Sequence, residues 1–167
     1  MASGDVKLAF AASSNLDVTN LNSLAASATW VAGWESALVD NSANLYEDYL
    51  LSGKITVGGA PTAGQVRIYV VALLDDATWP DVFDGTQSAE TITSALIGAG
   101  FMALAEVFSP DTSASAVYFF GPVSVANLFG GICPLKFVMF ITHSLVQAIA
   151  AAGHQVTVKG VYHTVAP

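Results

Sequence analysis

Short stretches in which apolar and polar residues alternate recur along this chain, and segments rich in glycine, proline and other turn formers separate them. In the clearest stretch, residues 49–57, large apolar side chains occupy one face of an extended strand, while Ser52, Lys54 and Thr56 occupy the other. Long amphipathic helices are missing from the pattern. Short strands at this spacing are typical of β-sandwiches and β-barrels, so the sequence predicts an all-β domain.

Several strands can be placed from this alternation. Residues 49–74 predict a β-hairpin, because the alternation continues on both sides of a glycine-rich turn. Residues 154–165 predict a last strand, in which Gly160 marks a bulge. Leu135 to Thr142 carries apolar residues on both faces, so we expect it at the centre of a sheet, with one side in the core and the other beneath a loop or a neighbouring subunit.

Two segments leave alternatives open. Residues 88–107 predict a short helix capped by Ser88 or Thr91, followed by a strand from about Phe101. Residues 144–152 fit a helix and a further strand equally well.

The chain has the length of one ordinary domain, at 167 residues. Residues 1–22 include a polar stretch and predict an N-terminal arm or loop that orders on a neighbouring subunit, and residues 23–167 predict a single β-sandwich domain.

Composition indicates that other molecules cover part of the surface. Charged residues make up 11% of the chain, against about 25% in typical soluble domains, and hydrophobic residues make up 53%. So few charges leave apolar surface, and we expect other protein subunits to cover it. The net charge is −8 and the five basic residues are scattered, so nucleic acid is not an expected partner.

Neither a membrane nor a secretory route is predicted. The longest uncharged stretch, Thr112 to Leu135, is broken by glycines and prolines and does not suit a spanning helix. The first residues lack the pattern of a secretory signal. Cys133 is the only cysteine, so it has no internal disulfide partner, and we interpret it as a small buried hydrophobic residue. We therefore expect synthesis inside the cell.

An acidic loop, residues 75–85, contains four aspartates together with Trp79 and Phe83. Calcium prefers such oxygen ligands, but the spacing does not match the known helix-loop-helix pattern. The alternatives are that the aspartates set turns, or that Trp79 and Phe83 anchor a partner protein. The interpretation of the loop stays open among these three.

Other combinations of reactive residues give weaker signals. The acids Glu35, Glu47 and Glu106 are scattered, and nothing identifies one of them as the proton donor of a glycosidase. The histidines, residues 143, 154 and 163, do not show the spacing of a zinc site. We therefore assign no catalytic residue, no metal ligand and no cofactor, while calcium binding by the acidic loop stays open.

Aromatic residues are the candidates for contact with a partner. Trp30 and Trp34 are four residues apart, so on an extended strand they point to one side, as a sugar-binding platform or as packing residues. The complete set of candidate interface residues is Trp30, Trp34, Trp79, Phe83 and Phe129.

Five segments carry a combined pattern: WESALVDN, LLSGKITVG, QVRIYVVALLDD, NLFGGICPLKFVMFI and HQVTVKGVYHTV. Together they resemble small virion structural proteins of tailed bacteriophages, of the kind that decorate or cement capsids. The resemblance implies an antiparallel, jelly-roll-like β-sandwich with at most one or two short helices. It also implies a homotrimer on the capsid exterior, bound to the major capsid protein, and it carries over no catalytic residues.

Two other classes of function remain as alternatives. A carbohydrate-binding module of a fibre or spike would also be a small β-sandwich, and it predicts that Trp30, Trp34 or Trp79 is exposed. An enzyme predicts a deep pocket with converging polar groups. We rank the capsid decoration protein first, the carbohydrate-binding module second and a hydrolase third.

Overall fold

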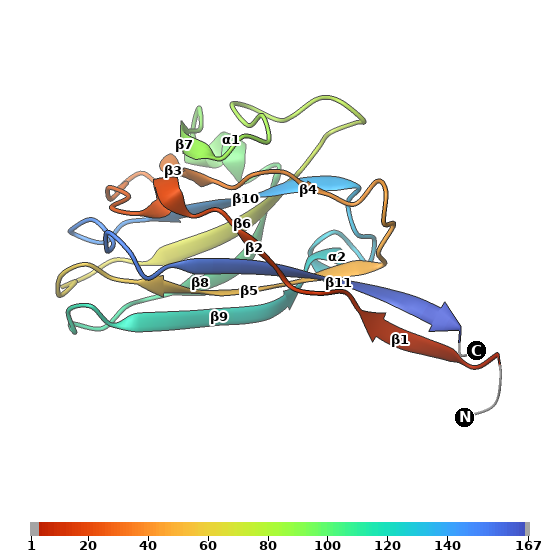
Figure 1. Ribbon diagram of the computed structural model, residues 1–167. Helices are drawn as coiled ribbons and strands as arrows, with labels where there is room; N and C mark the ends of the chain where they lie inside the picture. The colour runs from red at the N-terminus through yellow and green to blue at the C-terminus, as the bar shows by residue number, and fades with distance from the viewer. Residues whose placement is uncertain (1–3, 166–167) are drawn as a thin grey trace.

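The computed structural model describes residues 4–165 and contains two antiparallel sheets packed face to face (Figure 1). The first sheet has the strand order β1-β11-β5-β9, and β2 also pairs with β11. Its strands are β1 (Val6–Phe10), β2 (Ser14–Leu16), β5 (Asp48–Thr56), β9 (Val117–Ser124) and β11 (Gln155–Val165). The prediction of an all-β sandwich is confirmed.

The second sheet has the order β7-β3-β10-β6-β8, and β4 also pairs with β10. Its strands are β3 (Ala32–Glu35), β4 (Val39–Asp40), β6 (Val66–Ala72), β7 (Ser88–Thr91), β8 (Met102–Phe108) and β10 (Lys136–His143). Two four-residue helices, α1 (Ala95–Gly98) and α2 (Val125–Leu128), and a 3₁₀ turn, η1 (Thr19–Leu21), complete the described chain.

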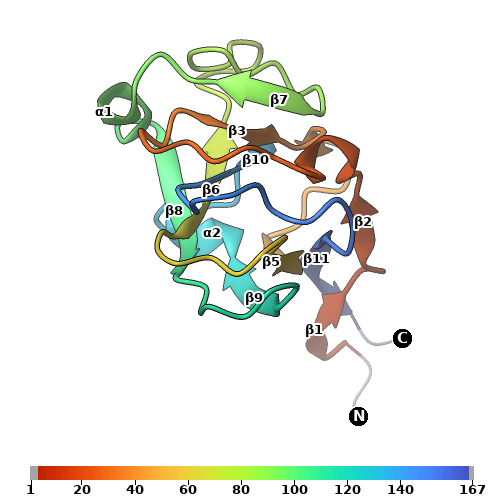
Figure 2. The same cartoon turned by 90° about the vertical axis from the view of Figure 1, so that its left-hand side faces the viewer.

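The topology is that of a jelly roll. With β1 and β2 taken as one interrupted strand, β3 and β4 as another, and β7 as an addition at the edge, eight strands remain. The chain passes from one sheet to the other at each step except from β6 to β8, as in a jelly roll built from two Greek keys. Figure 2 shows the two layers end on.

The prediction of a hairpin over residues 49–74 is wrong. Strand β5 pairs with β11 and β9, whereas β6 pairs with β10 and β8, so the turn between them crosses from one sheet to the other. The alternation within each strand was correct, with Leu51 and Ile55 buried on β5 and Ile68 buried on β6. Alternation reports which face is buried, and it does not report which strand is the neighbour.

The N-terminal segment is not an arm that waits for a neighbouring subunit. Strands β1 and β2 both pair with β11 of the same chain, through Val6 opposite Val165 and Leu16 opposite Val156. The arm hypothesis is therefore wrong for the described part of this segment, and residues 1–3 lie outside the described residues.

The structure of residues 88–107 and 144–152, the two segments with open alternatives, differs from the expectation. Residues Ser88–Thr91 form strand β7, and the short helix begins later, where the Ser94 hydroxyl accepts a hydrogen bond from the Ile97 N–H at 3.1 Å. Both Ser88 and Thr91 were therefore wrong as caps, while the strand from about residue 101 is confirmed as β8. Residues 144–152 contain neither a helix nor a named strand.

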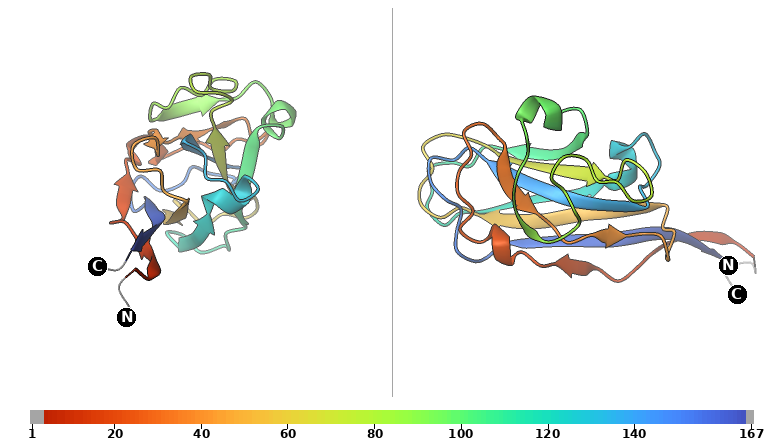
Figure 3. Two further views of the ribbon diagram at one scale, coloured as in Figure 1. Left: turned by 90° about the vertical axis from the view of Figure 1, so that its right-hand side faces the viewer. Right: turned by 90° about the horizontal axis from the view of Figure 1, so that it is seen from above.

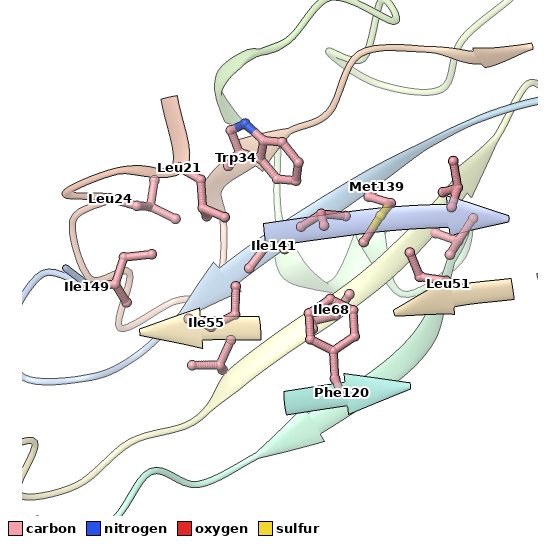
Figure 4. Packing of buried hydrophobic residues seen from close by; sticks show 14 of the residues in the cluster. Leu21, Leu24, Trp34, Leu51, Ile55, Ile68, Phe120, Met139, Ile141 and Ile149 are labelled. Carbon is pink, nitrogen blue, oxygen red and sulfur yellow. The ribbon is translucent and has the colours of Figure 1, made fainter. Parts of the chain in front are cut away.

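Strand β10 lies at the centre of its sheet, as predicted, and separates two apolar clusters. Phe137, Met139 and Ile141 face the main core between the sheets, where they pack with residues of β5 and β6 (Figure 4). Val138 and Phe140 face outward into a second cluster with Phe83 and Ile92. The outer side is therefore covered by the chain's own segment between β6 and β8 rather than by a neighbouring subunit.

Gly160 does not mark a bulge, because β11 pairs with β5 in a continuous register from Gln155 to Val161. The residue is a glycine because a Cβ there would lie 2.2 Å from the ring of Tyr46. We expect Gly160→Ala to lower the free energy of unfolding by about 1–3 kcal/mol, since this crowded ring must move. Urea unfolding checks this, and an unchanged midpoint would contradict the proposed close packing.

Candidate protein-protein interface

Two of the five candidate interface residues are buried within their own chain. Trp34 is 0% exposed and lies in the main core (Figure 4). Phe83 is 4% exposed and its ring packs edge-to-face on Phe140, with the ring centroids 5.4 Å apart. The prediction that Trp34 and Phe83 are interface residues is wrong, because both side chains are buried in the interior of the chain. Large aromatic side chains commonly pack in such interiors.

The other three candidates are half-buried. Trp79 packs against the second cluster and Phe129, which follows α2, packs against the main core. Trp30 precedes strand β3 in a turn with a positive φ of 63°, so it does not share the direction of Trp34. Trp79 and Phe129 therefore pack against different apolar clusters.

A two-stranded ribbon projects from one end of the sandwich and is the clearest candidate for contact with a partner (Figures 1 and 3). Val161 is the last residue of β11 that pairs with β5, and beyond it β11 pairs only with β1. The ribbon is therefore defined as residues 6–10 together with residues 161–165. An isolated pair of strands is marginally stable in water, and a covering partner would stabilise it.

The ribbon exposes large apolar side chains along one face. Val6, Leu8 and Phe10 alternate with Lys7 and Ala9 on β1, and they are 66%, 55% and 49% exposed. Val165 lies opposite Val6 in the register and is 62% exposed. Residues opposite each other in an antiparallel pair share a face, so these side chains form one largely apolar strip, in which His163, opposite Leu8, is the polar member.

The base of the ribbon is tied to the body of the sandwich. Nδ1 of His163 lies 2.5 Å from Oε1 of Glu47, within hydrogen-bond distance. The ring of Tyr162 lies 5.6 Å from that of Tyr46, and the Lys159 amine lies 5.4 Å from the ring of Phe10. These contacts hold the ribbon in a fixed direction relative to the sheets.

The alternation along β1 is a sequence signal for this ribbon. Residues 6–10, with the sequence VKLAF, alternate in the same way as the strands that were predicted correctly. An exposed strand at the edge of a sheet offers both unpaired backbone groups and apolar side chains to another protein.

The aspartates of the acidic loop bind the chain's own polypeptide groups. Asp75 accepts the N–H groups of Ala77 and Thr78 at 2.8 and 2.6 Å, and Asp81 accepts the N–H of Thr93 at 2.7 Å. These hydrogen bonds hold the pKa of Asp75 below its usual value. Across residues 4–165, no group of three or more His, Cys, Asp or Glu side chains could hold a metal ion. The loop geometry thus favours the turn-setting interpretation.

Glu35 performs a structural role that its sequence position did not suggest. The side chain is fully buried, and its Oε1 accepts the N–H groups of Asp84 and Gly85 at 3.2 and 2.8 Å, while Oε2 has no partner among the described residues. Burial raises the pKa of this carboxyl group to about 7. Glu35 therefore joins strand β3 to the acidic loop that covers the second cluster.

The histidines and the cysteine fit packing roles. His143 and His154 are buried, desolvation lowers the pKa of each, and each ring bonds a backbone carbonyl, of Leu24 and Ala150 respectively. Cys133 packs against the main core, and burial raises the pKa of its thiol to about 11. A thiol with a raised pKa is a poor nucleophile at neutral pH.

The sequence matches no protein-family model, and a search of curated proteins found no match. Within the described residues, no helix is long and apolar enough to cross a membrane.

Proposed function

We propose that the protein is a non-catalytic structural subunit of a virion, which decorates or cements the outside of a phage capsid as a homotrimer. Its partners would be the major capsid protein and copies of itself. The observation that carries the proposal is the projecting ribbon with its exposed apolar strip.

Two further features support this role. Jelly rolls with this pattern of crossings occur in viral capsid and lectin domains, where stacked sheets leave loops and edges free for contact. The net charge of −8 would repel packaged DNA, which favours a position on the outer surface of a shell.

The alternative, a carbohydrate-binding module, needs an exposed aromatic platform. Trp34 is buried, Trp79 packs against the second cluster, and Arg67 lies over the ring of Trp30. The aromatic residues of this chain therefore give the alternative less support than the ribbon gives to assembly.

The test uses light scattering and co-sedimentation with capsid shells that lack the protein. We expect the wild-type chain to form a discrete oligomer and to sediment with shells. Leu8→Ser combined with Phe10→Ser should weaken shell binding by at least about tenfold, because each apolar side chain that the shell would bury contributes about 1.5–3 kcal/mol to binding.

The matched control is Phe119→Ser, which removes a side chain that is 78% exposed on β9, away from the ribbon. We expect this variant to bind shells like the wild type. A monomeric wild-type protein that ignores shells would refute the proposed function, and equal losses in both variants would refute the role of the ribbon.

A further inference from the structure

A groove of about 250 Å³ lies on the outer face of the second sheet, away from the ribbon. Arg67 and Tyr69 of β6 form its floor, because they alternate with the core residues of that strand. The remaining walls come from the turn before β3, from α1 and from β8, through Trp30, Ala95, Ala99, Met102 and Leu104.

Arg67 holds a positive charge in this groove without an acidic partner among residues 4–165. Its Cζ lies 3.7 Å from the centroid of the Trp30 ring, and its terminal nitrogen donates one hydrogen bond to Gln65 Oε1 at 3.3 Å. The residues opposite it on the neighbouring strands are Thr142 and Val107, which carry no charge. A guanidinium group has five N–H donors, so most of them are available to a ligand.

The turn that carries Trp30 is built to hold the indole in place. Trp30 adopts a positive φ of 63°, which costs energy for a residue other than glycine. Buried Ser27 compensates, because its hydroxyl accepts the N–H groups of Val31 and Ala32 and its carbonyl accepts the N–H of Trp30. The indole holds the guanidinium over its ring, and a guanidinium edge suits a planar, bidentate acceptor.

The chemistry of the walls restricts what that acceptor can be attached to. Met102 and Leu104 are apolar, and Leu104 is 47% exposed. Beside Arg67, the hydroxyl of Tyr69 is the main polar side-chain group of the lining. A sugar would leave many hydroxyl groups without partners here, and an unpaired polar group opposes binding.

We propose that this groove binds a compact carboxylic acid with an apolar body. The carboxylate would accept two parallel hydrogen bonds from the edge of the Arg67 guanidinium, and the apolar body would lie against Met102 and Leu104. The site is independent of the ribbon, so it can succeed or fail separately from the proposed function.

The test is an NMR titration of the full chain with benzoate, and with benzamide as a neutral ligand of the same shape. We expect saturable shifts of the Trp30 indole N–H with benzoate, and at least tenfold weaker binding of benzamide. Arg67→Lys keeps the charge but loses the bidentate geometry, and it should also weaken benzoate binding at least tenfold.

Two controls keep the result interpretable. Lys54→Gln removes a positive charge on β5 of the other sheet and should leave benzoate binding unchanged. An unchanged backbone spectrum of Arg67→Lys, apart from residues around the groove, shows that the variant is folded. If that spectrum collapses, the comparison of benzoate with benzamide on the wild-type chain still decides the question. Equal binding of the two, or tighter binding of N-acetylneuraminate than of benzoate, would overturn the proposal.

Discussion

Phe140→Ala should lower the free energy of unfolding by about 3–5 kcal/mol, the cost of removing a buried phenylalanine ring and leaving a cavity. The ring is 0% exposed, contacts Phe83 and lies over Gly33, where a Cβ would come within 2.5 Å of it. It therefore packs the acidic loop segment onto the central strand β10. Chemical unfolding monitored by tryptophan fluorescence measures the effect.

Phe119→Ala provides the comparison, because it removes the same ring from a position that is 78% exposed. We expect its effect on the isolated chain to stay within about 0.5 kcal/mol. If Phe140→Ala lowered the free energy of unfolding as little as Phe119→Ala, the second cluster would add little stability. The loop would then be held mainly by its hydrogen bonds.

The contribution of Glu35 to stability should fall as the pH rises from about 5 to 8, opposite in sign to the contributions of His143 and His154, whose lowered pKa values favour the folded chain as the pH rises. In the folded chain the pKa of Glu35 is raised to about 7, above the ordinary value of 4.5, so the folded state keeps this proton over a range where the unfolded state has lost it. The contribution of Glu35 to the free energy of unfolding is therefore complete below the lower pKa. It decreases as the pH rises, until the pH passes the upper pKa. Between pH 5 and 8 the loss from this group amounts to roughly 2–3 kcal/mol.

Glu35→Gln should remove this contribution, so the free energy of unfolding of the variant should rise with pH relative to that of the wild type, because glutamine does not ionise while its carbonyl oxygen can still accept the N–H groups of Asp84 and Gly85. Unfolding midpoints between pH 5 and 8 provide the measurement, and Glu106→Gln on β8 is the matched control. A glutamine variant that keeps the full slope of the wild type would assign the pH dependence to other groups.

Local patterns predicted individual strands well and their neighbours poorly. The alternation along β5, β10 and β11 reflects which side chains reach the interior, and that information is local to each strand. The crossing between β5 and β6 was missed because a turn rich in glycine allows a hairpin and a sheet-to-sheet connection equally. Strand pairing joins residues that are far apart in the chain, so the alternation within one strand does not predict which strand lies beside it.

The candidate sites were predicted only in part, for a related reason. The side chains of Trp30 and Trp34 were predicted to point to the same side, on the assumption that both lie on one extended strand. However, β3 begins only at Ala32, and Trp30 adopts a positive φ. The contact between Trp30 and Arg67 joins positions that are distant in sequence, so it follows from the fold alone. The ribbon face could have been predicted from the alternation in residues 6–10.

The position of the ribbon also gives the molecule two distinct ends. Val6 and Val165 pair in the ribbon, whereas the loops between β5 and β6, between β8 and β9 and between β10 and β11 gather at the opposite end of the sandwich (Figure 1). A tag fused near the ribbon would obstruct the proposed contact with the shell. If the ribbon binds a shell as proposed, residues 112–115, which are exposed in the loop between β8 and β9, would present an inserted peptide on the side away from that shell.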